Sequence, residues 1–346
     1  MPHLAQERGG QARPAPGFAG GNNNWEPIMQ RRRLPGTDLN VSALCYGTGG
    51  FGTALRDAEL DLRIRAFRDA GGNFFDTAHC YAFWVAGGDG ASERALGDYL
   101  RRNGRGDLVI GTKGGHISAP NYRQVENWLS PGRISADIDD SLARLGLDTL
   151  DFYWLHRDDT RLQPGEIIET LNAEIHRGRI RFLGASNWRA ARIAAANDYA
   201  TAHGLQGFAA SQPEWNLARK NIPDAVRNDT TGTAALYLPD KDLEWHRQTG
   251  FPLVPYSSTA CGYFGSGGVR AREAYDGALS QARLSHCRKL AAELNATPGQ
   301  IALAWLLNQT FPVFPIIGTL TVEHLREAAG ATAIRLTPQQ VAWIAG

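Results

Sequence analysis

The sequence has few cysteines, little net charge and no long apolar run. Only four cysteines occur among 346 residues, at positions 45, 80, 261 and 287, and no two of them form a CxxC pair. This scatter argues against a zinc site or a redox pair and is typical of proteins from a reducing compartment. We therefore predict a cytoplasmic protein without a resident metal.

The charges nearly balance, because the chain has 36 Lys and Arg residues and 35 Asp and Glu residues, which gives a formal net charge of +1. A chain without a basic field is not expected to bind nucleic acid or an anionic membrane surface. No apolar run approaches the roughly 18–20 residues that a bilayer span requires. We predict neither a nucleic-acid partner nor a membrane partner.

The first residues are rich in Gly, Pro, Ala and Asn and contain no apolar segment like that of a secretory signal. Such a composition cannot bury a core. We predict a flexible N-terminal extension over residues 1–30 and one folded domain over residues 31–346. The length of that domain suits a barrel, which usually takes about 250 residues or more.

From residue 43 onward, short apolar runs alternate with segments of helical periodicity. Leu60, Ile64 and Phe67, for example, recur at the spacing of one buried helix face. This alternation predicts a parallel sheet closed into a (β/α)8 TIM barrel, preceded by a hairpin around Pro35-Gly36. The strands are expected within 43–50, 73–76, 108–110, 150–156, 180–183, 208–211, 251–255 and 313–317, and the helices at 59–70, 92–100, 131–145, 164–177, 189–203, 298–307, 321–329 and 338–345.

Three consecutive predicted strands end in ionisable residues. The first ends at Asp76, with Tyr81 five positions later, and the next two end at Lys113 and His156. The C-terminal ends of barrel strands meet at one face, where active sites of this architecture lie. The four side chains are therefore expected to form one site.

These four positions and their flanking motifs resemble the aldo-keto reductase family. The resemblance implies an oxidoreductase that depends on NAD(P)(H) and reduces a small aldehyde or ketone to an alcohol, or runs the reverse reaction. It also implies a hairpin across the barrel floor. The flanking motifs are Gly90-Ala91-Ser92-Glu93-Arg94-Ala95-Leu96-Gly97, Gly184-Ala185-Ser186-Asn187, Gln212-Pro213-Glu214-Trp215-Asn216 and Pro255-Tyr256-Ser257.

The resemblance implies a role for each member of the tetrad. Tyr81 would donate the proton in carbonyl reduction and accept it in alcohol oxidation. A free tyrosine has a pKa of about 10, and the ammonium of Lys113 is expected to lower it. Asp76 would hold Lys113 charged, and His156 would donate to the carbonyl oxygen. Relatives that reduce carbon–carbon double bonds carry a glutamate in place of this histidine, so His156 implies carbonyl or alcohol chemistry.

The cofactor contacts are also implied by the resemblance. Ser186, Asn187 and Gln212 would hold the carboxamide, and Tyr256 would stack on the nicotinamide. The other expected contacts are Gly47, Thr48 and Asp76, then Ser257 and Ser258 at the pyrophosphate, and Gly318, Thr319, Thr321, His324 and Glu327 at the adenosine end.

The adenosine-end segment departs from the usual family pattern. Relatives often have Lys or Arg just after the last strand, Arg at the position of His324 and Asn at the position of Ala328. The chain therefore has few of the cationic residues that form a clamp for the 2′-phosphate of NADP(H), so we call this clamp thin. We favour NADP(H) on the habit of the family, with NAD(H) as the alternative.

Two other functions stay open, and the substrate and the oligomeric state do not follow from the sequence. The first is a non-catalytic nucleotide-binding subunit, because the family includes channel-associated subunits. The second is an NAD-linked sugar or cyclitol dehydrogenase, which the thin clamp and the polar loops favour. Two long segments, 116–131 and 216–249, leave strand ends and should overhang the site. The tryptophans considered as its lining are Trp84, Trp128, Trp215 and Trp245.

Overall fold

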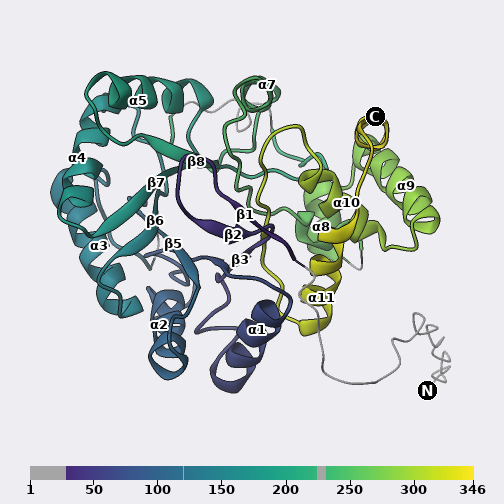
Figure 1. The fold of residues 1–346 in the computed structure, drawn as a ribbon, viewed down its shortest axis with the longest axis horizontal. Helices are drawn as coiled ribbons and strands as arrows, with labels where there is room; N and C mark the ends of the chain where they lie inside the picture. Colours follow the sequence, from purple (N-terminus) through teal and green to yellow (C-terminus); the bar gives the residue numbers. More distant parts are fainter. Residues whose placement is uncertain (1–28, 120, 224–230, 266) are drawn as a thin grey trace, which may run out of the picture.

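The computed structural model describes residues 29–119, 121–223, 231–265 and 267–346. Nearly all of the predicted extension over residues 1–30 lies outside the described residues. Figure 1 shows the strands gathered at the centre of the molecule, with helices α1 to α5 wrapped around one side. This arrangement is that of a (β/α)8 barrel, as the alternation of strands and helices predicts.

Seven parallel strands form the barrel sheet, in the order β8-β7-β6-β5-β4-β3-β9. Their register brings the C-terminal ends together, since Asp76 pairs with Gly47 on one side and Gly111 on the other, and Lys113 pairs with Trp154. The strands are β3 (Cys45–Gly47), β4 (Phe74–Asp76), β5 (Val109–Gly114), β6 (Leu150–Leu155), β7 (Ile180–Ser186), β8 (Phe208–Gln212) and β9 (Ile316–Ile317).

The barrel closes through single-residue bridges instead of a full eighth strand. Leu253 forms a parallel bridge to Ser211 on one side and to Val313 on the other. The strand predicted at 251–255 is reduced to this bridge, and the one predicted at 313–317 shortens to Ile316–Ile317. The prolines at 252, 255, 312 and 315 explain the reduction, because proline lacks the N–H that a sheet needs.

The predicted hairpin is present and closes the floor of the barrel. Strands β1 (Arg31–Arg33) and β2 (Asn40–Ser42) pair antiparallel, and Figure 1 shows them crossing the centre of the barrel. Leu34 and Val41 are fully buried in one cluster with the inward residues of the strands, such as Phe74 and Trp154. The hairpin thus seals the end of the barrel opposite the predicted site.

The helices follow the predicted spans closely where a proline marks the start. Helices α3, α10 and α12 cover the predicted ranges because Pro is favourable in the first helical turn. Helices α8 and α9 were not predicted, and α9 buries only four of its 16 residues. The helices are α1 (Asp57–Asp69), α2 (Ala91–Asn103), α3 (Pro131–Leu145), α4 (Pro164–His176), α5 (Ala190–Ala202), α7 (Asp240–Thr249), α8 (Val269–Tyr275), α9 (Ala278–Glu293), α10 (Pro298–Leu307), α11 (Val322–Gly330) and α12 (Pro338–Ala345).

None of the helices in the described ranges combines the length and apolarity that crossing a bilayer requires.

Candidate active site

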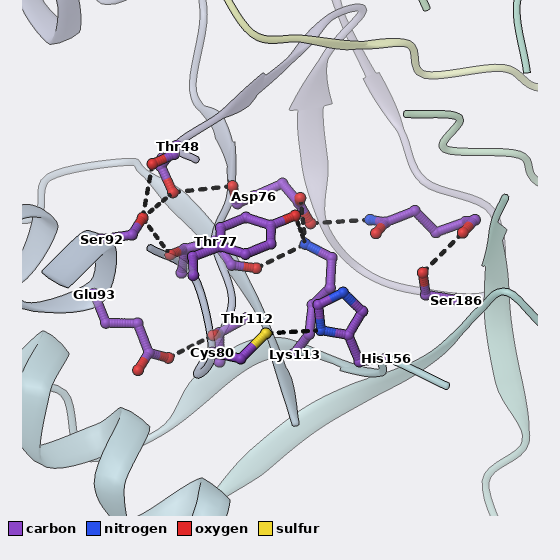
Figure 2. Close-up of polar contacts among 12 residues, drawn as sticks. Thr48, Asp76, Thr77, Cys80, Ser92, Glu93, Thr112, Lys113, His156 and Ser186 are labelled. Atoms are coloured by element: carbon purple, nitrogen blue, oxygen red, sulfur yellow. Dashed lines mark hydrogen bonds and ion pairs between the residues drawn. The ribbon is translucent and has the colours of Figure 1, made fainter. Parts of the chain in front are cut away.

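The four predicted catalytic side chains meet at the C-terminal face of the barrel. Asp76 is the last residue of β4, Lys113 lies one residue before the end of β5, and His156 follows β6 directly. Tyr81 stands in the turn after β4. Figure 2 shows Asp76, Lys113 and His156 converging there. The parallel register therefore assembles a site from residues up to 80 positions apart in the sequence.

Lys113 is the centre of this site. Its Nζ donates to Asp76 Oδ2 at 2.5 Å, to the carbonyl of Thr77 at 2.8 Å and to Tyr81 Oη at 2.9 Å. Its side chain is 2% exposed and that of Asp76 is 3% exposed. The ammonium thus uses its three protons on three oxygens, one of which is the predicted proton donor.

The second oxygen of Asp76 is also occupied. Gln212 Nε2 donates to Asp76 Oδ1 at 2.9 Å. The other end of this amide, Gln212 Oε1, is buried and has no hydrogen-bond partner in the described part of the chain. A buried acceptor without a partner is costly, so Gln212 Oε1 is a natural point for a bound donor group.

The pKa values differ in part from expectation. Burial works against the charge of Lys113, but Asp76 and Tyr81 outweigh it and raise the pKa of Lys113. Burial raises the pKa of Tyr81 to about 12, although Lys113 acts in the opposite direction. The predicted net lowering of the tyrosine pKa is therefore wrong for this structure, because desolvation of the phenolate exceeds the attraction of the ammonium.

His156 lies beside two residues that the sequence analysis did not place in one group with it. Its Nδ1 is 3.5 Å from the sulfur of Cys80, and its ring meets that of His116 edge to face at 4.7 Å. Burial lowers the pKa of His156 well below its usual range, and it lowers the pKa of His116 to about 4. Both imidazoles are therefore neutral near pH 7.

A buried polar network contacts the strand and the loop that carry Lys113 and Tyr81 (Figure 2). Thr112, next to Lys113, donates to Glu93 Oε1 at 2.6 Å. Arg144 reaches Glu93 at 3.2 Å and the carbonyl of His79 at 2.9 Å. This network fixes the loop that carries Tyr81. Sequence reasoning found only the motif containing Glu93, because nothing in the local pattern predicts its partner on α3.

Comparison with known proteins assigns the family. A sequence model described as "Aldo/keto reductase family" matches residues 43–346. The chain belongs to this family. It is 27% identical over 330 residues to the "Probable aldo-keto reductase 1" of Glycine max, covering 90% of this chain and 87% of that one. It is 29% identical over 342 residues to "Norsolorinic acid reductase B" of Aspergillus parasiticus, covering 91% and 83%.

A solved structure confirms the architecture. The crystal structure of a thermostable aldo-keto reductase with the inhibitor epalrestat matches with a TM-score of 0.66 and 25% identity, over 91% of this chain and 98% of that one. The predicted family and the predicted barrel are thus confirmed. Members of this family are oxidoreductases of small carbonyl compounds and bind a nicotinamide cofactor.

In the segment predicted to bind the nicotinamide, the polar groups of the Asn187 side chain all have hydrogen-bond partners, whereas Gln212 Oε1 has none in the described part of the chain. Asn187 Nδ2 donates to the His156 carbonyl and to Ser186 Oγ, both at 3.0 Å. Its Oδ1 accepts from Tyr256 Oη at 2.8 Å and from the Leu236 amide at 2.9 Å. Asn187 has therefore no spare donor for a ligand, and Gln212 Oε1 is the free acceptor of the group.

The residues predicted at the adenosine end of an aldo-keto reductase cofactor line one cleft of about 610 Å³. Sequence reasoning missed a second part of its lining, between Thr259 and Ala271, which is rich in glycine. Gly262 has a φ of +83°, and a Cβ on Gly267 would lie 2.6 Å from the Gly262 carbonyl, so neither position accepts a side chain without strain. The predicted lining residues are Gly318, Thr319, Thr321, His324 and Glu327, and the additional ones include Thr259, Cys261, Gly262, Gly265, Gly267 and Arg270.

Several predicted contact residues already have structural partners. Thr48 is fully buried, and its hydroxyl lies 2.8 Å from Ser92 Oγ and 3.1 Å from the Asp76 carbonyl. Ser258 donates to the Ile316 carbonyl at 2.5 Å. A Cβ on Gly47 would come within 2.8 Å of Ile316. Ser257 has a φ of +54°, which is rare outside glycine and marks a strained turn.

The two long loops reach the site as predicted. In the first loop, Tyr122 contacts both His79 and His116, and in the second the Leu236 amide donates to Asn187. Among the tryptophans, Trp84 packs near Tyr81 at a ring distance of 6.0 Å. Trp215 instead packs against Trp305 and Phe311. It therefore belongs to the core and not to the lining of the site.

Proposed function

We propose that this chain is an NAD(P)(H)-dependent oxidoreductase that reduces an aldehyde or ketone to an alcohol, or runs the reverse reaction. The observation that carries the proposal is the contact of Lys113 Nζ with both Tyr81 Oη, at 2.9 Å, and Asp76 Oδ2, at 2.5 Å. A phenol next to a buried, charge-compensated ammonium is a proton donor whose anion is stabilised as it forms.

The proton is the part of the reaction that the protein itself supplies. When bound, the nicotinamide supplies the hydride. Tyr81 Oη gives its proton to the carbonyl oxygen, and the ammonium of Lys113 stabilises the phenolate that remains. The pKa of about 12 keeps Tyr81 protonated at neutral pH, as a proton donor requires. Asp76 holds Lys113 in its charged form throughout.

His156 is proposed to orient the carbonyl group. It is neutral, so it donates one hydrogen bond without competing with Tyr81 for the role of acid. Its ring lies 5.9 Å from that of Tyr81, centre to centre, which brings both side chains within reach of one oxygen atom. The backbone carbonyl of His156 accepts from Asn187, so the turn that carries the ring is fixed.

The cofactor is proposed to extend from Gln212 to the glycine-lined cleft, with the free Gln212 Oε1 accepting from the carboxamide. NADP(H) is favoured over NAD(H). In support, Arg270 lines the same cleft as Thr319 and His324. The cation missing after the last strand can therefore come from the glycine-rich part of the lining.

A second candidate is an NAD-linked sugar or cyclitol dehydrogenase. The observation that favours it is that Gly318, His324 and Ala328, which stand at the expected 2′-phosphate clamp, line the cleft without a Lys or Arg among them. In that case Arg270 would face solvent and the phosphate would not be recognised.

Parallel titrations of NADPH and NADH, followed by protein fluorescence, test the proposal. Tighter binding of NADPH supports a reductase of aldehydes or ketones, and equal or tighter binding of NADH supports the dehydrogenase. Turnover of a panel of aldehydes, ketones and polyols then separates both from a non-catalytic nucleotide-binding subunit. Nucleotide binding without any turnover would overturn the proposal.

A further inference from the structure

Cys80, His116 and His156 form a buried group in which the possible metal-ligating atoms all lie within 4.8 Å of one another. The Cys80 sulfur is 3.5 Å from His156 Nδ1, and Figure 2 shows the two side chains joined next to Lys113. The residues follow three neighbouring strands, β4, β5 and β6, so the barrel itself holds them together.

The surroundings hold the two imidazole ligands in their neutral form, whereas burial raises the pKa of the Cys80 thiol to about 12, so the metal has to displace its proton. His116 Nδ1 lies 2.9 Å from the Ile117 carbonyl, which fixes the proton on Nδ1 and leaves the lone pair on Nε2. His156 is likewise neutral, and neutral imidazole is the ligand form. Tetrahedral Zn²⁺ holds sulfur and nitrogen ligands about 3.3–3.6 Å apart, given its usual bond lengths. The pair of Cys80 and His156 already meets this spacing.

We propose that these three residues form an inhibitory site for Zn²⁺ or a similar thiophilic divalent cation. One thiolate and two imidazoles match the ligand preference of Zn²⁺ and leave its fourth position open to water. On binding, the Cys80 thiol loses its proton to solvent, and the metal–sulfur bond takes its place.

Inhibition follows from the position of the site. One of its three ligands is His156. A cation bound to His156 prevents this side chain from orienting the carbonyl group and occupies the space proposed for the substrate. The cationic side chains of Lys113 and Arg157 lie nearby. They oppose the metal charge, so the site is expected to be weaker and more reversible than a structural zinc site. The inhibition rests on the proposed function, whereas metal binding does not.

Titration of the purified full-length chain with Co²⁺ tests binding without reference to activity. One equivalent should produce thiolate-to-cobalt absorption in the near ultraviolet and tetrahedral bands in the visible, and Zn²⁺ should displace it. Cys80→Ser and His116→Gln, tested separately, should each weaken Co²⁺ binding at least about 100-fold. Cys261→Ser removes the one exposed cysteine and is the matched control, because it should leave binding unchanged.

Zn²⁺ should also inhibit carbonyl turnover competitively with the carbonyl substrate, and EDTA should restore it. The inhibition constant should rise at least about tenfold in both ligand variants but not in Cys287→Ala, which removes a cysteine of α9 outside the site and the cleft. Cobalt bands that persist in both variants, or that are lost in Cys261→Ser, would overturn the metal site. Cobalt binding by a chain without any carbonyl turnover would instead keep the metal site and remove the proposed function.

Discussion

The proposed catalytic tetrad and the proposed nucleotide cleft are carried by different strands of the barrel and differ in how the backbone is built. Lys113 and the residue before His156 belong to β5 and β6, six residues each and fully buried. The cleft includes Ile317 of β9, a strand of only two residues that follows Pro315. Lys113 is thus held by a long buried strand, whereas the proposed phosphate-binding surface is built from irregular, glycine-rich backbone.

Their electrostatics differ in the same way. On the tetrad side, charges are buried and paired, as in Asp76 with Lys113 and Glu93 with Arg144. In the cleft, Arg270 and His324 are exposed. Salt screens a buried or partly buried pair much less than it screens exposed charges. The first arrangement suits proton transfer, and the second suits reversible capture of a nucleotide.

The largest effect is expected from Tyr81→Phe, which should lower the turnover number but leave nucleotide binding nearly unchanged. Tyr81→Phe should lower kcat about 10²–10⁴-fold, because the proton donor is lost. The affinity for NADPH should stay within about twofold of the wild type, since the cleft lies elsewhere. Steady-state kinetics and fluorescence titration measure the two quantities. Activity retained in this variant would remove Tyr81 as the acid.

Stability should respond differently on the two sides. Asp76→Ala leaves Lys113 buried without its partner and should lower the free energy of unfolding by about 3–5 kcal/mol. His324→Ala, at an exposed position of the cleft, should change it by about 0.5 kcal/mol or less. Urea unfolding without nucleotide measures both. Equal losses would mean that the buried pair is not the stabilising feature described here.

The pH dependence should differ for the two directions of the reaction. Alcohol oxidation needs the Tyr81 phenolate, whose fraction rises with pH below a pKa of about 12. The kcat/KM for oxidation should therefore rise about tenfold per pH unit from about pH 7 to about pH 9, while that for reduction stays flat. Lys113→Met should lower the oxidation rate at each pH, because the phenolate loses its stabilising ammonium. An oxidation profile that is flat with pH would contradict this assignment.

Arg270→Ala probes the cleft without touching the tetrad. If Arg270 binds the 2′-phosphate, its loss should weaken NADPH binding about 10–100-fold, the value of a charge-assisted hydrogen bond, and leave NADH binding unchanged. Arg272→Ala is the matched control, since Arg272 lies on the same helix α8 but does not line the cleft. Parallel losses for both nucleotides would show that Arg270 does not read the phosphate.

Thr321→Ala should lower the stability less than Asp76→Ala does. Its hydroxyl caps α11 by accepting from the His324 amide at 3.2 Å. Removing an N-cap lowers the free energy of unfolding by about 0.5–2 kcal/mol. Thermal or urea unfolding measures the loss, and Thr321→Ser should restore most of it. A Thr321→Ser variant as unstable as Thr321→Ala would show that the cap is not the cause.

Much of the fold and the centre of the site follow from the sequence, for physical reasons that particular residues illustrate. Pro131 and Pro298 mark helix starts because their missing N–H is unneeded there. Asp76, Lys113 and His156 were predicted to meet because parallel strand ends share one edge. Helix α9 was missed, since Cys287 and Leu290 are among the few residues that it buries.

The rest of the site depends on packing between distant segments. Cys80, His116 and Arg270 lie outside the strands, and no local periodicity places them relative to the tetrad. The pKa of Tyr81 was misjudged for a related reason. The sequence identifies a neighbouring ammonium, but the depth of burial, which decides the sign of the shift, is a property of the folded chain.

The closure of the barrel at Leu253 has a consequence for local opening. The bridges there join Ser211, next to Gln212, to Val313, just before β9. Few backbone hydrogen bonds hold each side of this segment, such as Val254 N–H to the Ser211 carbonyl and Phe314 N–H to the Leu253 carbonyl, so local opening here breaks only a few of them. A nucleotide that contacts Gln212 and Thr319 would hold the two sides of this seam together. Amide hydrogen exchange around Leu253 should then slow when the cofactor is bound, because the cofactor stabilises the closed barrel in addition to its part in the reaction.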